Sequence, residues 1–344
     1  MRWMPCVVRS YSPGGDLSSV VVGHPMVDEF LEFCRARCRP NTIVALAWDL
    51  KTFFAFVDKP PSKVTSSDVL SFIRAQSSGG DGKVVRLDGS GGVSSRTIRR
   101  RVSSVSSFYA YVLVHGDTSI TRNPVPRGLA TRRERSGTRQ GVALVRNVKT
   151  LPRVLAPVEV DALIAALRTE RDRAMVEAMV LGGLRRCEVL GLRLGDVRVG
   201  ERRVFINDGK GGRQRLIPIS NRFFATLGRY LESERPDGVA TDRLFVVLKG
   251  PRRGLPLSAD GLDEIIQGAR GRAGLTHATC HELRHTCFTR LREAGMSLEA
   301  IQAQAGHASI ETTRLYLHLA DDWLAGEYRK AAEAIDAQNL RATS

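Results

Sequence analysis

The side chains best suited to phosphate chemistry gather in one short segment, His281-Glu282-Leu283-Arg284-His285. At about 100° per residue on a helix, His281, Arg284 and His285 fall on one narrow stripe. A histidine can move protons and an arginine can bind phosphate oxygens, so the stripe suits a reaction at a phosphate. The same letters spell H-E-x-x-H, the zinc metalloprotease pattern, although a guanidinium on the ligand face would repel the metal ion. The segment therefore predicts a phosphate site, with a zinc site as the alternative.

Two further segments carry residues for the same chemistry. Arg185 comes at the end of an apolar helical segment, and Glu188 follows three residues later, which fits either a phosphate clamp with an orienting carboxylate or a surface ion pair. Lys210 lies at the tip of a predicted hairpin, as the only lysine between Lys149 and Lys249. Lysine can give up a proton near neutral pH and arginine cannot, so this position predicts a titrating group, with a plain surface charge as the alternative.

A tyrosine near the carboxyl end completes the candidates. Tyr316 follows His307 by nine residues and is flanked by Leu315 and Leu317. Taken alone, a tyrosine in such surroundings is more typical of a core than of a nucleophile.

In order and spacing these segments resemble the tyrosine recombinase family. The matching motifs are Arg185 in G-L-R-x-x-E, Lys210 in a G-K-G-G hairpin, H-x-L-R-H at 281–285, Gly306-His307, and Tyr316 nine residues past that histidine. The close resemblance covers about residues 155–320. The chain departs from the family pattern at two positions beside these motifs. Ala305 stands where a leucine is usual, and Gly182 stands where a threonine is frequent.

The resemblance implies a site-specific DNA recombinase for integration, excision or resolution, with chemistry like that of type IB topoisomerases. Strands would be cut and rejoined through a 3′-phosphotyrosyl bond. The implied catalytic residues are Arg185, Lys210, His281, Arg284, His307 and Tyr316, supported by Glu188 and His285. No cofactor and no metal ion are implied. The implied partners are double-stranded DNA, three further copies of the chain on two recombination sites, and accessory DNA-bending proteins. A zinc metalloprotease and a DNA-binding relative that does not cut remain the alternatives.

Composition is consistent with a nucleic-acid partner. Lys and Arg outnumber Asp and Glu by 52 to 36, a formal net charge of +16, and such an excess favours a polyanion. No apolar run is long enough to cross a bilayer. The six cysteines form no C-x-x-C pair and are typical of reduced thiols. We therefore expect a protein of the cytoplasm, associated with the nucleoid.

Apolar periodicity predicts a mainly α fold with a small β-sheet, an α+β protein. Together with the family resemblance, which implies the roles of the domains, the pattern leads us to expect a flexible arm over 1–24, a helical core DNA-binding domain over 25–120, a basic linker over 121–155, the catalytic domain over 156–320, and a C-terminal helix or tail for protomer contact over 321–344. Within the catalytic domain, helices are predicted over 158–167, 171–181, 222–234, 259–272, 281–294, 298–305 and 310–317, with strands over 202–207 and 213–219.

Overall fold

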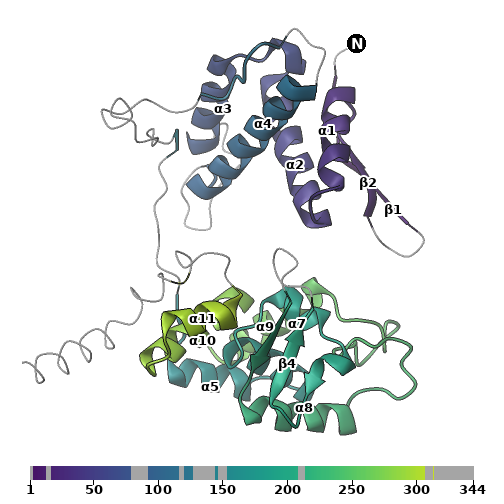
Figure 1. Cartoon of the computed structure of the whole chain (residues 1–344), viewed down its shortest axis with the longest axis vertical. Coiled ribbons are helices and arrows are strands. Elements are labelled where there is room, and N and C mark those ends of the chain that lie inside the picture. Colours follow the sequence, from purple (N-terminus) through teal and green to yellow (C-terminus); the bar gives the residue numbers. More distant parts are fainter. Residues whose placement is uncertain are drawn as a thin grey trace, which may run out of the picture. The chain divides into compact units, whose positions relative to one another are not determined.

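The computed structural model describes residues 3–12, 17–78, 92–115, 120–126, 144–145, 153–207, 214–306 and 313. The chain divides into two compact units, Met1–Lys149 and Thr150–Ser344 (Figure 1). Each unit has its own apolar core, so each is described by itself.

The first unit is a bundle of four helices preceded by a β-hairpin. Its elements are β1 (Val8–Tyr11), β2 (Leu17–Val21), α1 (Pro25–Arg35), α2 (Pro40–Val57), the 3-10 turn η1 (Pro61–Lys63), α3 (Ser66–Ser78) and α4 (Ser95–His115). Pro25 and Pro40 begin α1 and α2, where their missing N–H groups leave no helical bond unmade. The helical structure expected over 25–120 is thus present.

Aromatic side chains fill the centre of this bundle. Phe53, Phe54, Phe72 and Phe108 are each at most 1 % exposed, and neighbouring rings meet edge to face. The buried hydroxyl of Tyr109 donates to the Pro61 carbonyl at 2.9 Å. The core therefore ties α2, α3 and α4 to the η1 turn.

The N-terminal residues differ from the flexible arm expected over 1–24. β1 and β2 pair in an antiparallel two-stranded sheet, and β2 packs on α1 and α2. The Trp3 ring lies 5.0 Å from the Phe54 ring, and the Asp28 carboxylate accepts the backbone N–H of Val22 at 2.5 Å. The Trp3–Phe54 contact joins residues far apart in the sequence, so local periodicity near the N-terminus could not reveal it.

The second unit is mainly helical with a small sheet. Its elements are α5 (Pro157–Ala165), α6 (Glu170–Val180), α7 (Arg186–Gly191), the 3-10 turn η4 (Leu194–Asp196), β3 (Val197–Arg198), β4 (Arg203–Ile206), β5 (Arg215–Pro218), α8 (Asn221–Ser233), α9 (Ala259–Arg272), α10 (Cys280–Glu293) and α11 (Leu298–Ala305). The strands form an antiparallel sheet of order β3-β4-β5. The expected α+β class is confirmed.

Helix α6 is the central element of this unit. It packs against α8 and α10, and Ala174 to Val180 are all buried. Its one deeply buried acid in that stretch, Glu177, accepts a hydrogen bond from the Arg222 Nε atom of α8 at 2.8 Å. The unit thus has a buried central helix that ends at Val180, shortly before Gly182, Gly183 and Arg185.

Two local features were not anticipated from the sequence. Arg185 was expected at the end of the preceding helix, whereas it begins a new short helix, α7, after a tight turn at Gly183. β3 adds a third strand beside β4. The expected helix over 310–317, apart from Thr313, the expected C-terminal helix or tail over 321–344 and the tip of the hairpin lie outside the described residues. Among the described helices, none has the length and apolar character needed to cross a membrane.

Candidate active site

Arg185 and Glu188 form the first part of the site, at the start of α7. Arg185 is the N-cap residue, and the Glu188 carboxylate accepts both its backbone N–H at 2.9 Å and its Nη1–H at 2.8 Å. The Glu188 side chain is fully buried, while the Arg185 side chain is 21 % exposed. The surface ion pair considered from sequence is therefore wrong, because this carboxylate is buried beneath the arginine.

Arg284, on α10, brings two distant segments together. Its guanidinium donates to the Gly183 carbonyl before α7 and to the Ala305 carbonyl at the end of α11, the latter at 2.7 Å. It also stacks over the Phe288 ring at 4.8 Å and lies 3.9 Å from the Glu188 carboxylate. The side chain is only 4 % exposed, so its position is determined by these contacts.

Gly183 makes that arrangement possible. Its φ of +68° lies in the region that favours glycine, and a Cβ there would come within 2.8 Å of the Phe288 Cε1 atom. Any other residue would push the Phe288 ring and with it the stacked Arg284 guanidinium. Both the backbone conformation and the close packing of Phe288 therefore require a glycine at position 183.

His281 and His285 lie one turn apart on α10, as the stripe predicted. Their Nε2 atoms are 2.8 Å apart, a hydrogen bond between the two rings. His281 is exposed and His285 is buried. Burial, followed by the positive charges of His281 and Arg284, lowers the pKa of His285 to about 4. His285 is therefore neutral near neutral pH and can hold the exposed ring of His281 in place.

The glutamate of the H-E-x-x-H pattern turns away from these histidines. Glu282 accepts the Thr279 hydroxyl at 3.0 Å, and its other oxygen lies 3.6 Å from the His277 Nδ1 atom. In the part of the chain that the structure describes, no group of three His, Cys, Asp or Glu side chains could hold a metal ion. The zinc alternative is not favoured by this geometry.

Arg215 belongs to the site but was not singled out from sequence. It is the first residue of β5, and it donates to both oxygens of Glu188, at 3.1 and 2.9 Å. A signal was available, because Arg215 is in phase with the buried Ile217 and Ile219 on a strand of period two. A charge on the buried side of a strand indicates a buried partner.

The glutamate keeps its charge among these arginines. Burial by itself raises the pKa of Glu188, but the hydrogen bonds and charges of Arg215, followed by those of Arg185, outweigh burial and hold the pKa below its usual value. Three guanidinium groups thus surround one ionised carboxylate. The surplus positive charge suits a phosphate.

The site therefore unites Arg185, Glu188, His281, Arg284 and His285 from α7 and α10. The other three expected residues, Lys210, His307 and Tyr316, lie outside the described residues. Two of them lie close to described elements in the sequence. Lys210 lies between β4 and β5, and His307 follows Gly306, the C-cap residue of α11.

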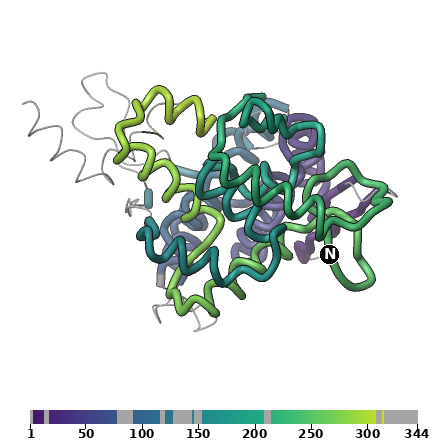
Figure 2. Tube along the Cα trace, turned by 90° about the horizontal axis from the view of Figure 1, so that it is seen from below, coloured from purple at the N-terminus to yellow at the C-terminus, as the bar shows by residue number. Residues whose placement is uncertain are grey.

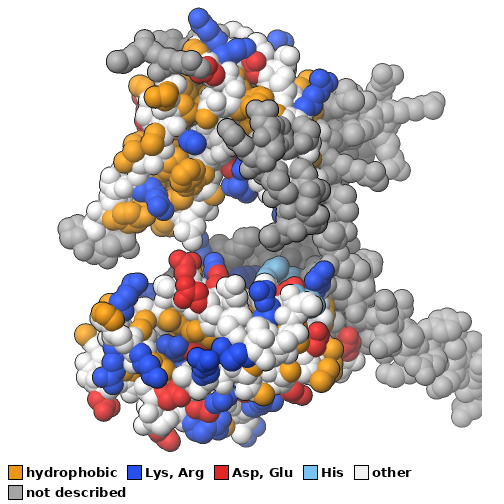
Figure 3. All heavy atoms as spheres, turned by 180° about the vertical axis from the view of Figure 1, so that it is seen from behind, with side chains coloured by type: hydrophobic (Ala, Val, Ile, Leu, Met, Phe, Trp, Pro, Cys, Tyr) orange, Lys and Arg blue, Asp and Glu red, His pale blue; other side chains and the backbone are white. Residues whose placement is uncertain are grey.

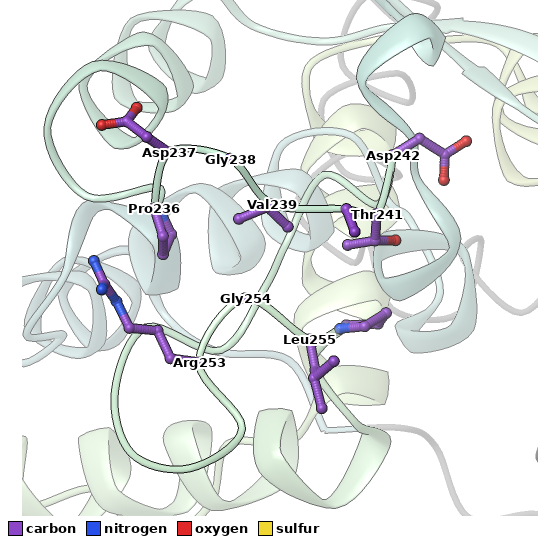
Figure 4. Close-up of a pocket in the computed structure, with 11 residues that line it drawn as sticks. Pro236, Asp237, Gly238, Val239, Thr241, Asp242, Arg253, Gly254 and Leu255 are labelled. Atoms are coloured by element: carbon purple, nitrogen blue, oxygen red, sulfur yellow. The ribbon is translucent and has the colours of Figure 1, made fainter.

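A separate cleft of about 860 Å³ lies between the loops after α8, lined by residues 236–242 and 253–256 (Figure 4). Figures 1 and 2 place these loops at the opposite side of the unit from α10 and α11. The cleft shares no residue with the arginine and histidine cluster.

Comparison with known proteins assigns the family. Residues 153–322 match the phage integrase family, and residues 27–116 match the phage integrase N-terminal SAM-like domain. Tyrosine recombinase XerC of Pelobacter propionicus is 31 % identical over 303 residues, which cover 85 % of this chain and 89 % of that protein. This chain belongs to the phage integrase family of tyrosine recombinases. It is therefore an enzyme of site-specific DNA recombination, which cleaves and rejoins DNA.

A second relative is similar in sequence, and two solved structures share the fold. Tyrosine recombinase XerD of Listeria monocytogenes is 28 % identical over 312 residues, which cover 86 % of this chain and 94 % of that protein. The Tn1549 transposon integrase in complex with transposon right end DNA shares its fold with a TM-score of 0.67 at 17 % identity, over 89 % of this chain and 98 % of that one. The XerH recombinase bound to a palindromic difH substrate shares the fold with a TM-score of 0.63 at 18 % identity, over 88 % of this chain and 83 % of that one.

Proposed function

We propose that this recombinase cleaves DNA with Tyr316 as its nucleophile. The Tyr316 hydroxyl attacks the scissile phosphorus, the bond to the 5′-oxygen breaks, and a 3′-phosphotyrosyl link forms. A 5′-hydroxyl of the partner strand then attacks this link, releases the tyrosine and completes the exchange. The energy of the broken phosphodiester is conserved in the covalent intermediate, so the two steps need no ATP.

The arginine cluster carries this proposal. Arg185 and Arg284 bind the non-bridging phosphate oxygens and stabilise the charge that develops in the transition state. The convergence of both arginines on the buried Glu188 supports this role, because the carboxylate neutralises only part of their charge. Glu188 orients Arg185 and does not touch the phosphate.

Proton transfer falls to the lysine and the histidines. A free tyrosine has a pKa near 10, so His281 assists removal of the Tyr316 proton and its later return. The neutral ring of His285 positions His281 through their shared hydrogen bond. Lys210 protonates the leaving 5′-oxygen, and His307 donates a hydrogen bond to the phosphate.

The proposed reaction also requires several protomers on DNA. Exchange between two sites requires four cleavages, so we infer a homotetramer on two duplexes, with residues 321–344 in contact with a neighbouring protomer and with accessory DNA-bending proteins. The lambda integrase tetramer bound to a Holliday junction shares the fold with a TM-score of 0.62 at 19 % identity, over 85 % of this chain and 76 % of that one, which supports the inference. We further infer that this recombinase acts in the cytoplasm, at the nucleoid.

A covalent-trapping assay tests the central step. The purified protein is mixed with pooled genomic fragments carrying nicks that prevent religation, then resolved under denaturing conditions with EDTA present. We expect a DNA-linked band for the wild type and none for Tyr316→Phe, because only the hydroxyl can form the ester, while both proteins bind DNA equally. A covalent adduct that survives in Tyr316→Phe would refute the assignment of the nucleophile. Sequencing of the trapped DNA would identify the recombination site.

A further inference from the structure

Among the described arginines of the site, Arg215 is the least exposed after Arg284, and it has no role in the proposed mechanism. Its side chain is 11 % exposed, and its Nη1 and Nη2 atoms donate to the Glu188 Oε1 and Oε2 atoms, respectively. This is a bidentate pair, the strongest geometry that an arginine and a carboxylate adopt. The partners are 27 residues apart, so the pair attaches β5 to the start of α7.

The same guanidinium also contacts the end of α11. Its Nε atom donates to the Gln304 carbonyl at 3.1 Å. Gly306 lies against it so closely that a Cβ there would be 3.0 Å from the Arg215 Nη1 atom, and the φ of +60° at Gly306 also favours glycine. Arg215 thus touches the residue that directly precedes His307 in the chain.

The side-chain hydrogen bonds to the Glu188 carboxylate come from two arginines, Arg185 and Arg215. Because Arg215 occupies one site on each carboxylate oxygen, the Arg185 side chain makes a single bond to Glu188, through Nη1. Without Arg215, the buried carboxylate would have only Arg185 and Arg284 to compensate its charge. A buried ion that loses a partner recruits the nearest available cation, since an uncompensated buried charge is costly.

We propose that Arg215 is a positioning residue for strand cleavage: it pairs with both oxygens of Glu188, so that Arg185 makes only one side-chain bond to this carboxylate and keeps its other donors for the scissile phosphate, and it ties β5 to the end of α11. This inference rests on the phosphate-binding role proposed for Arg185 and Arg284. It predicts that loss of Arg215 impairs the chemical step and leaves DNA binding intact.

Single-turnover cleavage of a nicked substrate tests the proposal, with DNA affinity and thermal unfolding measured on the same proteins. For Arg215→Met we expect the cleavage rate to fall about 100-fold, the cost of misplacing a binding group by about 1 Å, with DNA affinity within about twofold of wild type. Arg215→Lys keeps the charge but cannot bridge both oxygens, so we expect an intermediate loss.

Two further variants separate positioning from mere stability. Arg222→Met removes a partner of another buried carboxylate, Glu177, in the same unit, and should lower the unfolding temperature without slowing cleavage. In the double variant Arg215→Met/Glu188→Gln, the amide oxygen can still accept the one side-chain bond that orients Arg185, but it has no charge with which to capture the rest of the guanidinium. We therefore expect cleavage to recover about tenfold over Arg215→Met alone, the size of coupling found between contacting residues.

The outcomes separate the two proposals. If the wild type forms a Tyr316-dependent adduct but Arg215→Met cleaves at the wild-type rate, or slows no more than Arg222→Met, the role of Arg215 is refuted and the mechanism stands. If Arg215→Met does not fold, Arg215→Lys decides, and wild-type cleavage by that variant refutes the role. A wild type that yields no Tyr316-dependent adduct refutes the mechanism itself, and the inference about Arg215 with it.

Discussion

His285 illustrates how the surroundings of one residue determine its chemistry. It shares the stripe of His281 on α10, yet it is buried next to the Arg284 guanidinium, and its pKa falls from 6.5 to about 4. The two histidines thus differ in environment although they are one turn apart. The exposed ring can meet DNA, while the buried ring serves as its support.

This pKa predicts an acid-sensitive fold. Between pH 6.5 and about 4 the unfolded chain binds a proton at His285 that the folded chain excludes, so the free energy of unfolding falls as the pH falls through that window. The full loss amounts to about 3 kcal/mol for this residue. Chemical denaturation at several pH values would measure it, and His285→Gln should show a correspondingly flatter dependence. An unchanged dependence in His285→Gln would contradict the burial of an uncharged ring.

At the scale of elements, a carboxylate of α1 binds the segment that follows the N-terminal hairpin. Asp28 accepts the backbone N–H groups of Val22 at 2.5 Å and of Gly23 at 3.2 Å. These two amides lie between β2 and α1, so Asp28 connects the strand to the helix. We expect this short connection to contribute to the packing of β2 on α1 and α2.

Removal of this carboxylate should loosen the hairpin locally. In Asp28→Ala we expect the amides of β2 and of Val22 to exchange hydrogen faster, by the equivalent of about 2 kcal/mol, because hydrogen bonds to a charged acceptor are lost. Exchange in α3 and α4 should be unchanged. Glu29→Ala, which alters an exposed acid at the next position, is the matched control. Equal protection of β2 in both variants would show that the hairpin does not depend on Asp28.

At the scale of the whole molecule, both units carry Lys and Arg side chains on their surfaces, although each has its own core. The chain carries a net charge of +16, and described Lys and Arg side chains are visible on both units in Figure 3. Neutralised phosphates release counterions, so each basic contact adds to the salt dependence of DNA binding. Both units are therefore expected to contribute to it.

Separate expression of the units tests this expectation. Residues 1–149 and 150–344 should each unfold cooperatively, because each has its own buried core. A plot of the logarithm of DNA affinity against the logarithm of salt concentration should have a smaller slope for each unit than for the full chain. If 150–344 gave the slope of the full chain, the first unit would make no phosphate contact.

Local sequence patterns accounted for most of the helices and strands. Apolar periodicity placed α9 and α11 with the bounds that the structure has, and it placed β4 and β5 within two residues at each end. These elements are determined by neighbours three or four positions apart in helices and two apart in strands, so a single chain carries the signal. Helix α7 was missed because it is six residues long, too short for a period to show.

The sequence by itself determined the family, through five motifs in order, and the side chains proposed for the chemistry. Only the tertiary structure decided how the described ones are held: Glu188 buried beneath Arg185, Arg284 joined to both Gly183 and Ala305, and His285 kept neutral. The role of Arg215 also emerged only there, because its partner is 27 residues away and on another element. The physical reason is burial. Spacing along a chain tells which side chains can share a helix face, whereas desolvation and the pairing of buried charges depend on every element packed around them.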